Sequence, residues 1–157
     1  MQRLKLTLAI LKPDVYAQPI HHKRILKLIQ KEGFIVANET VASWNQQQAK
    51  AFYKEHDGKF FQQRLVEFMS SGEFHAMVLA HKTEDAITKW RGLLGFTKCY
   101  KARHQNPTSI RAMYGLSDTR NAGHGSDSLE SFVKEYEIIF PGWDPQQWAT
   151  EFQETSG

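Results

Sequence analysis

The segment with the clearest chemical potential is Asn121-Ala122-Gly123-His124-Gly125-Ser126-Asp127-Ser128. It places one histidine between two glycines, with small polar residues on both sides. Glycine widens the accessible backbone conformations and allows a ligand to come close. We therefore expect an uncovered imidazole that acts as a nucleophile or a ligand. Considered by itself, a single histidine is more often an ordinary residue of a surface loop.

Groups that suit phosphate oxygens occur at several places in the chain. Lys12, in Lys12-Pro13-Asp14, follows a predicted strand, Arg91 lies on a predicted helix, and Arg111 follows a long polar stretch that also contains the hydroxyl of Thr97. The guanidinium fork matches phosphate geometry, and an ammonium can neutralise phosphate charge. Each of these side chains taken alone is more commonly a solvated surface group.

Two aromatic positions and one carboxylate complete the set. Phe60, in Phe60-Phe61, follows a glycine turn and can stack on any nucleobase, whereas Tyr53 lies on a predicted helix. Glu135 lies about two helical turns into the helix after His124, where a carboxylate can hold one imidazole nitrogen and leave the other free. Core packing of the rings and solvation of the carboxylate are the alternatives. Together with Ser126, these residues form the parts needed for phosphoryl transfer from a nucleotide.

Several nucleotide and metal motifs are absent from the sequence. No G-x-x-x-x-G-K-[ST] motif is present, which excludes a P-loop protein, and the signature set of protein kinases is missing too. No spacing of histidine, cysteine and carboxylates predicts a metal cage. His21 and His22 are adjacent, so they cannot both point the same way from a helix and are not a zinc pair.

The composition is that of an ordinary globular protein. The 157 residues are 41% hydrophobic and 24% charged, with a formal net charge of +3, which predicts a single domain over residues 1–157 that mildly favours an anionic ligand. The sequence shows no secretory signal and no apolar run long enough for a membrane span. A single cysteine, Cys99, suits a reducing intracellular compartment, either the cytoplasm or the mitochondrion.

Hydrophobic periodicity predicts alternating strands and helices. We expect strands at residues 4–11, 34–44, 74–80 and 110–116, and helices at 20–32, 46–56, 61–69, 85–94 and 129–140. Residues 96–109 form a polar, basic loop in this interpretation, and residues 143–152 form a tail whose aromatic side chains dock onto the body. The order predicts an α+β, ferredoxin-like (βαββαβ) fold, a four-stranded antiparallel sheet with helices packed on one face.

The His124 segment resembles the active-site motif N-x-x-H-G-S-D-S of nucleoside diphosphate kinases. Lys12-Pro13-Asp14, Phe60-Phe61 and Ser109-Ile110-Arg111 follow the order of that family, and the resemblance extends from about residue 7 to 140. Residues 60–69, 102–104 and 118–121 are most similar to its divergent type 6 branch. The resemblance implies a ferredoxin-like core, in agreement with the pattern of elements.

The resemblance also implies a reaction and a role for each site residue. His124 would take the γ-phosphate of a nucleoside triphosphate as a phosphohistidine and pass it to a nucleoside diphosphate in a ping-pong cycle, with Mg²⁺ arriving on the nucleotide. By the same resemblance Phe60 stacks on the base, Lys12 and Asn121 contact sugar hydroxyls and phosphate, Arg91, Thr97 and Arg111 bind phosphate, Tyr53 lies beside the histidine, and Ser126 and Glu135 support it.

The chain also departs from the family pattern, which leaves alternatives open. Gly58-Lys59 stands where a proline is usual before the two phenylalanines, and the stretch from Thr97 to Arg111, which in hexameric members contributes to subunit contacts, is longer than usual. A weakly active or inactive member that acts through nucleotide and protein-partner binding is therefore an alternative to an active kinase. Besides nucleotides, the partners that we expect are a second copy of the chain in a homo-oligomer or another protein. A nucleic-acid-binding module is disfavoured because the strand at 4–11 carries no aromatic residue.

Overall fold

Four strands form one antiparallel sheet with the order β2-β3-β1-β4 in the computed structural model, which describes residues 5–156. The strands are β1 (Lys5–Leu11), β2 (Ile35–Ala42), β3 (Phe74–His81) and β4 (Gly123–Gly125). Residue 4, where the first predicted strand begins, lies outside the described residues. The predicted α+β class with a four-stranded antiparallel, ferredoxin-like sheet is therefore confirmed.

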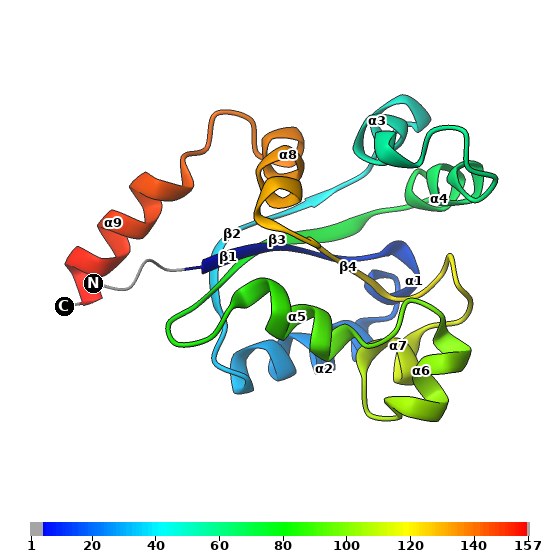
Figure 1. Cartoon of the computed structure of the whole chain (residues 1–157), viewed down its shortest axis with the longest axis horizontal. Helices are drawn as coiled ribbons and strands as arrows, with labels where there is room; N and C mark the ends of the chain where they lie inside the picture. Colours follow the sequence, from blue (N-terminus) through cyan, green and yellow to red (C-terminus); the bar gives the residue numbers. More distant parts are fainter. Residues whose placement is uncertain (1–4, 157) are drawn as a thin grey trace.

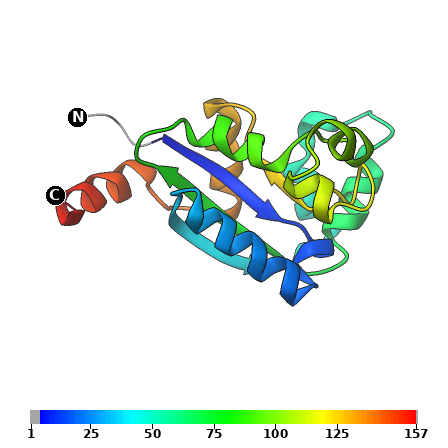
Figure 2. The ribbon, with the colours of Figure 1, turned by 90° about the horizontal axis from the view of Figure 1, so that it is seen from below.

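Helices cover both faces of the sheet, so the expectation of helices on one face is wrong (Figure 1 and, from below, Figure 2). The upper layer in Figure 1 contains α3 (Gln46–Phe52), α4 (Gln62–Met69) and α8 (Leu129–Ile139). The lower layer contains α2 (Pro19–Lys31), α5 (Ala86–Leu94), α6 (Cys99–Gln105) and α7 (Ile110–Tyr114). The remaining helices are α1 (Pro13–Tyr16), the short 3-10 helix η1 (Lys54–His56) and α9 (Pro145–Ser156).

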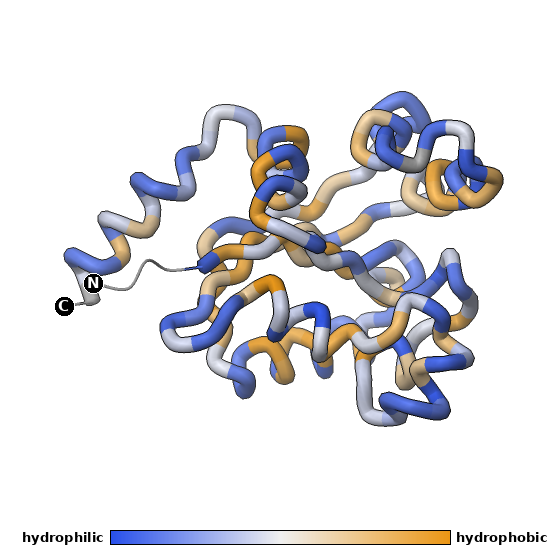
Figure 3. Tube along the Cα trace, in the orientation of Figure 1, coloured by the Kyte–Doolittle hydropathy of each residue, from blue (hydrophilic) through white to orange (hydrophobic). Residues whose placement is uncertain are grey.

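The alternation of side chains along β1 and β3 supplies both apolar layers. Leu8 and Val78 face the cluster that includes α3, α4 and α8, whereas Ala9 and Leu79 face the cluster with α2 and α5. All four side chains are completely buried. Figure 3 shows hydrophobic positions along the central strands and along the helices packed on them. The two central strands are therefore shielded on both faces, which is why they contain so few polar residues.

The fourth strand is not at residues 110–116, as the sequence predicts, but at Gly123–Gly125. Residues Ile110–Tyr114 form helix α7, which begins at Ser109, whose hydroxyl accepts a hydrogen bond from the Ala112 N–H at 3.2 Å. A short apolar run does not distinguish a strand from a buried helical turn, and a serine N-cap favours the helix. The correction moves the fourth strand onto the His124 motif itself.

Two other predicted segments differ from the structure. The polar stretch at 96–109 contains helix α6, whose buried positions are only Cys99 and Ala102, too few to produce a visible apolar period. The predicted helix at 46–56 ends at Phe52 and continues as the separate 3-10 turn η1. In both cases the helices are short, and their ends depend on tertiary contacts rather than on local periodicity.

The C-terminal tail docks onto the body, as predicted, although it is helical. Trp143 and Trp148 pack against the core cluster of the upper layer, and the ring of Trp148 stacks on Phe152 with centroids 5.1 Å apart. In Figure 1, α9 lies at the left, near the N-terminal end of β1. No helix within residues 5–156 is long and apolar enough to cross a membrane.

Candidate active site

His124 lies in the middle of β4, opposite Ile10 of β1. Ile10 belongs to the upper apolar cluster, so the imidazole points toward the layer of α3 and α8. There its ring meets Phe52 of α3 edge to face, with ring centroids 5.2 Å apart. The backbone carbonyl of His124 accepts a hydrogen bond from Trp90 Nε1 at 2.9 Å on the opposite side of the strand. Sheet register and two aromatic side chains together fix the position of this residue.

The two glycines beside His124 serve helix packing rather than exposure. A Cβ atom at Gly123 would come within 2.7 Å of Leu94, and one at Gly125 within 2.7 Å of Trp90, both on α5. The His124 side chain is only 19% exposed, so the expectation of an uncovered imidazole is wrong. The glycines allow α5 to lie directly on β4, because any larger residue would push the helix off the strand.

Glu135 of α8 holds the imidazole of His124. Its Oε2 lies 2.7 Å from His124 Nε2, and its Oε1 accepts a hydrogen bond from the Ser126 hydroxyl at 2.6 Å. The Ser126 hydroxyl in turn accepts the Leu8 N–H at 3.1 Å, which ties the group to the central strand. Among the described residues, no hydrogen bond engages the other ring nitrogen, Nδ1. The sequence prediction that a carboxylate orients this histidine agrees with this geometry.

Lys12 and Asn121, which lie 109 residues apart, form a buried pair at the other end of β4. Lys12 Nζ donates to Asn121 Oδ1 at 2.8 Å, and Asn121 Nδ2 donates to the backbone carbonyl of Thr97 at 3.2 Å. Burial, together with the charge of Arg111, lowers the pKa of Lys12 to about 7. The side chain of Lys12 is thus poised between charged and neutral forms, in a position that lacks solvent.

Arg111 braces the backbone on both sides of the site. One of its terminal nitrogens donates to the Gly95 carbonyl at 2.9 Å, and the other donates to the Gly123 carbonyl at 3.0 Å, directly before His124. Burial and the nearby charge of Arg91 lower the pKa of Arg111 to about 10. Arg111 therefore disfavours the charged form of Lys12, and Arg91 disfavours that of Arg111, which is the electrostatic condition that an anionic ligand would relieve.

Tyr53 is buried in the core beside these groups. Burial, and to a lesser degree the charge of Glu135, raises the pKa of its hydroxyl far above the usual value for tyrosine, so it remains neutral. Thr97 contributes its backbone carbonyl to Asn121, and its side chain is exposed, as is that of Arg91 at the end of α5. The structure thus brings nine of the ten predicted residues into one neighbourhood, directly or through shared hydrogen bonds and charges.

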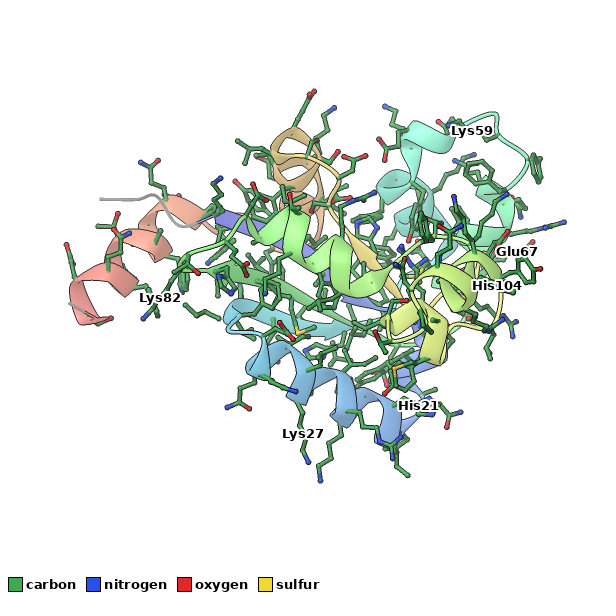
Figure 4. All side chains as sticks on the ribbon, turned by 60° about the horizontal axis from the view of Figure 1, so that its bottom comes forward. His21, Lys27, Lys59, Glu67, Lys82 and His104 are labelled. Atoms are coloured by element: carbon green, nitrogen blue, oxygen red, sulfur yellow. The ribbon has the colours of Figure 1, made fainter. Side chains whose placement is uncertain are left out.

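Phe60 is the predicted residue that the structure leaves apart. Its side chain is 82% exposed and contacts Phe61 edge to face, with centroids 5.7 Å apart. The segment that carries it projects from the sheet together with α3 and α4, and Figure 4 shows Lys59 on this segment and His104 on α6, both at the outside of the molecule.

A cavity of about 650 Å³ lies between α3 and α8, with Phe52 and Glu135 in its lining.

Residues 5–156 contain no group of three or more histidine, cysteine or acidic side chains that could hold a metal ion. His21 and His22 diverge, as their adjacency predicts. The ring of His21 contacts Tyr114 at 4.9 Å between centroids, and His22 Nε2 forms a hydrogen bond with His75 Nδ1 at 2.9 Å.

Two residues that build the site are missed by the sequence interpretation. Phe52 and Trp90 belong to the apolar faces of predicted helices, yet one packs on the His124 ring and the other bonds to the His124 carbonyl. The apolar period of a helix shows that a residue is buried but not what it is buried against. The indole N–H of a buried Trp90 was the available signal, because such a group requires an acceptor.

The fold and the site define a class of protein. A ferredoxin-like sheet presents a carboxylate-held histidine from a short edge strand, close to a lysine and two arginines. The sequence profile described as "Nucleoside diphosphate kinase" matches residues 5–144 of the chain. The chain belongs to the nucleoside diphosphate kinase family.

Individual relatives agree with this assignment and with the type 6 resemblance. The chain is 45% identical to human nucleoside diphosphate kinase 6 over 150 residues, which cover 96% of this chain and 80% of the relative. It is 45% identical to the zebrafish (Danio rerio) nucleoside diphosphate kinase 6 as well, over 94% of this chain and 83% of the relative. The crystal structure of the Aquifex aeolicus nucleoside diphosphate kinase is similar, with a TM-score of 0.83 and 40% identity over 88% of this chain and 96% of that one.

Proposed function

We propose that this chain is an active nucleoside diphosphate kinase that transfers the γ-phosphate of a nucleoside triphosphate to a nucleoside diphosphate through phosphorylated His124. The observation that carries the proposal is the contact of 2.7 Å between His124 Nε2 and Glu135. A carboxylate at this nitrogen favours the tautomer with the proton on Nε2, which leaves the lone pair of Nδ1 available. Family membership supports the same reaction.

The reaction follows from that tautomer in two half-reactions. In the first, the Nδ1 lone pair attacks the γ-phosphorus, and the bond to the bridging oxygen breaks, so that the nucleoside diphosphate leaves with the electron pair. Glu135 stabilises the positive charge that develops on the ring, since it accepts the Nε2 proton in a charge-assisted hydrogen bond. In the second half-reaction a different nucleoside diphosphate attacks the phosphohistidine and regenerates the free ring.

The cationic groups stabilise the phosphates during transfer. We assign Arg111, Arg91 and Thr97 to the phosphate chain, and Lys12 with Asn121 to sugar hydroxyls and phosphate. Arg111 is already held in place by the Gly95 and Gly123 carbonyls, so its charge needs no rearrangement when negative charge develops. Mg²⁺, as part of the nucleotide substrate, would neutralise phosphate charge, and the chain would contribute positioning and electrostatics rather than acid–base chemistry.

We assign Phe60 to the binding of the base, and Tyr53 and Ser126 to the support of His124. Phe60, with its exposed ring, is suited to stack on a nucleobase with little discrimination among bases. Tyr53 packs beside the reacting group with a neutral hydroxyl, and Ser126 holds Glu135 in position. We further propose that residues 1–157 constitute one domain and that the protein acts in a reducing compartment, cytoplasm or mitochondrion, where Cys99 remains a free thiol.

A labelling experiment tests the proposal. The wild-type chain and the His124→Asn variant are each incubated with γ-labelled ATP and Mg²⁺, and a nucleoside diphosphate is then added. We expect acid-labile label on the wild type only, followed by rapid transfer of the label to the acceptor. If the wild type binds the nucleotide but takes up no label, the kinase proposal is wrong and the alternative applies: a family member that acts through nucleotide and protein-partner binding.

A further inference from the structure

Ala122 is the single non-glycine residue within residues 5–156 that has a positive φ, at 75°. The left-handed region disfavours residues with a Cβ atom, and it persists where the surrounding structure enforces it. Ala122 is completely buried and lies two residues before His124. A disfavoured backbone conformation therefore stands directly at the entrance to β4, where the chain turns toward the reacting imidazole.

The junction between β1 and α1 forms hydrogen bonds with both the N–H and the carbonyl of Ala122. Asp14 Oδ2 accepts a hydrogen bond from the Ala122 N–H at 3.0 Å, and the Lys12 N–H donates to the Ala122 carbonyl at 2.9 Å. The second carboxylate oxygen of Asp14, Oδ1, accepts the Val15 N–H at 3.0 Å. Each oxygen of Asp14 therefore accepts one backbone N–H. An ionised carboxylate can accept at both oxygens, so it satisfies both donors.

The chain before His124 is also held on either side of Ala122: Lys12 and the Thr97 carbonyl bind the Asn121 side chain, and the Gly123 N–H donates to the Asn121 carbonyl at 2.9 Å. Strand β4 contains only three residues, and its ladder to β1 runs from Ala9 to Leu11. Arg111 holds the Gly123 carbonyl, but this carbonyl follows Ala122 in the chain and does not bind that residue itself. The conformation at Ala122 thus sets the angle at which β4 joins the sheet, and with it the placement of the imidazole.

We propose that Asp14 is a positioning residue for phosphoryl transfer, because its carboxylate clamps the left-handed turn at Ala122 and so aims His124. This inference rests on the proposed function of His124. Asp14 is assigned no contact with the imidazole or with the nucleotide. Its effect passes through one peptide N–H, that of Ala122, which distinguishes it from the groups that hold the ring directly.

A rival explanation of any effect at Asp14 is its charge, because Lys12 lies two residues away and interacts with it electrostatically. The two explanations differ in their dependence on Ala122. Glycine adopts a positive φ without steric cost, so a turn with glycine at this position needs the clamp less. An effect through the charge of Lys12 does not depend on which residue occupies position 122.

The test is a double-mutant cycle with Asp14→Asn, Ala122→Gly and the combined variant. Asparagine keeps one acceptor oxygen but sets an N–H₂ group against the second backbone donor. In single turnovers at saturating Mg²⁺–ATP, we expect Asp14→Asn to slow phosphohistidine formation about tenfold in the wild-type background. In the Ala122→Gly background, the same change is expected to slow it about twofold or less. Equal costs in the two backgrounds overturn the proposal.

A second measurement needs no variant and no enzymatic activity. Burial raises the pKa of the Asp14 carboxyl, with Lys12 opposing this shift. In the unaltered chain, the amide proton signals of Ala122 and Val15 are followed by NMR as the pH is lowered. We expect both signals to move with one common midpoint, since both N–H groups donate to Asp14. An Ala122 signal that does not shift together with the Val15 signal overturns the proposed role of Asp14. If the two signals share a midpoint but the wild type takes up no label from γ-labelled ATP, only the kinase proposal is rejected.

Discussion

Around His124 the polar groups hold one another, whereas around Phe60 the side chains stand in solvent. The Ser126 hydroxyl and His124 Nε2 lie 2.6 and 2.7 Å from the two oxygens of Glu135, all within a buried or half-buried group. Phe60 is 82% exposed, and its ring meets that of its neighbour Phe61. In the proposed function the centre is preorganised for phosphoryl transfer, and the exposed ring of Phe60 at the rim adapts to different bases. If this contrast holds, substitutions in the two regions have separable effects.

The largest effect is expected from Glu135→Gln in the centre. An amide presents one acceptor where Ser126 and His124 both require one, and it lacks the charge that stabilises a positive ring. The rate of phosphohistidine formation should fall about 10²–10⁴-fold, as for other oriented imidazoles. The matched control is Glu137→Gln, an exposed carboxylate on the same helix. Similar rates for the two variants would show that Glu135 does not orient the histidine. Single-turnover labelling measures both.

The next effect is expected from Arg111→Lys. Lysine retains a positive charge but cannot bridge the Gly95 and Gly123 carbonyls, which the two guanidinium nitrogens reach at 2.9 and 3.0 Å. We expect kcat/KM to fall about 10²–10³-fold, because preorganised charge at the phosphates is lost. Steady-state kinetics check this value, with Arg24→Lys on the exposed face of α2 as the control. Unchanged kinetics would mean that charge alone, without the fork, suffices at this position.

We expect the affinity for the nucleotide to depend on pH through the protonation of Lys12. Its pKa is lowered to about 7 by burial and by Arg111, so the free protein loses this charge as the pH rises above that value. A polyanionic ligand favours the charged form, so binding takes up a proton and weakens at higher pH. The Kd for Mg²⁺–ADP should increase about tenfold per pH unit above about pH 7.

Isothermal titration calorimetry measures this dependence between about pH 6 and 9, a range that brackets the pKa of Lys12. Lys12→Arg, which remains charged across that range, should flatten it, whereas Lys134→Arg on α8 should leave it intact. A Kd for the wild type that stays constant across the range contradicts the assignment of Lys12 as a titrating group.

The smallest effect is expected at the rim. Phe60→Ala removes base stacking that contributes about 1 kcal/mol to nucleotide binding, so KM for the nucleotide should rise about fivefold with kcat almost unchanged. Thermal unfolding should not shift, because the ring is 82% exposed. Tyr100→Ala, at 73% exposure on α6, is the matched aromatic control and should leave KM unaltered. A large loss of kcat in Phe60→Ala would show that the rim and the centre are coupled.

Much of the fold was predictable because its signals are local. Asp85 caps α5 through a hydrogen bond from the Thr88 N–H at 3.1 Å, and the alternation of β1 predicted a strand that ends in a turn. The errors fall where the local signal was ambiguous. Ile110–Tyr114 is as apolar as a strand, and its helical state depends on packing of Ile110 against the lower core cluster.

The candidate site was predictable by residue type but not by arrangement. The sequence interpretation paired Glu135 with His124 correctly, because both lie in one short segment and its following helix. It took the flanking glycines as a means of exposure, whereas they allow Trp90 and Leu94 to pack on β4. It did not assign a role to Asp14, because the N–H that this carboxylate accepts belongs to a residue 108 positions away.

The sequence by itself determined the chemical inventory, the alternation of strands and helices, and the family, since residue types and short spacings are carried by the chain locally. Only the tertiary structure decided which groups meet. Leu8 with Ser126, Lys12 with Asn121, and Asp14 with Ala122 are separated by 118, 109 and 108 positions, and the pairing of β4 with β1 brings them together. Sheet register acts over the whole chain, so its consequences for the position of His124 cannot be read from any one segment.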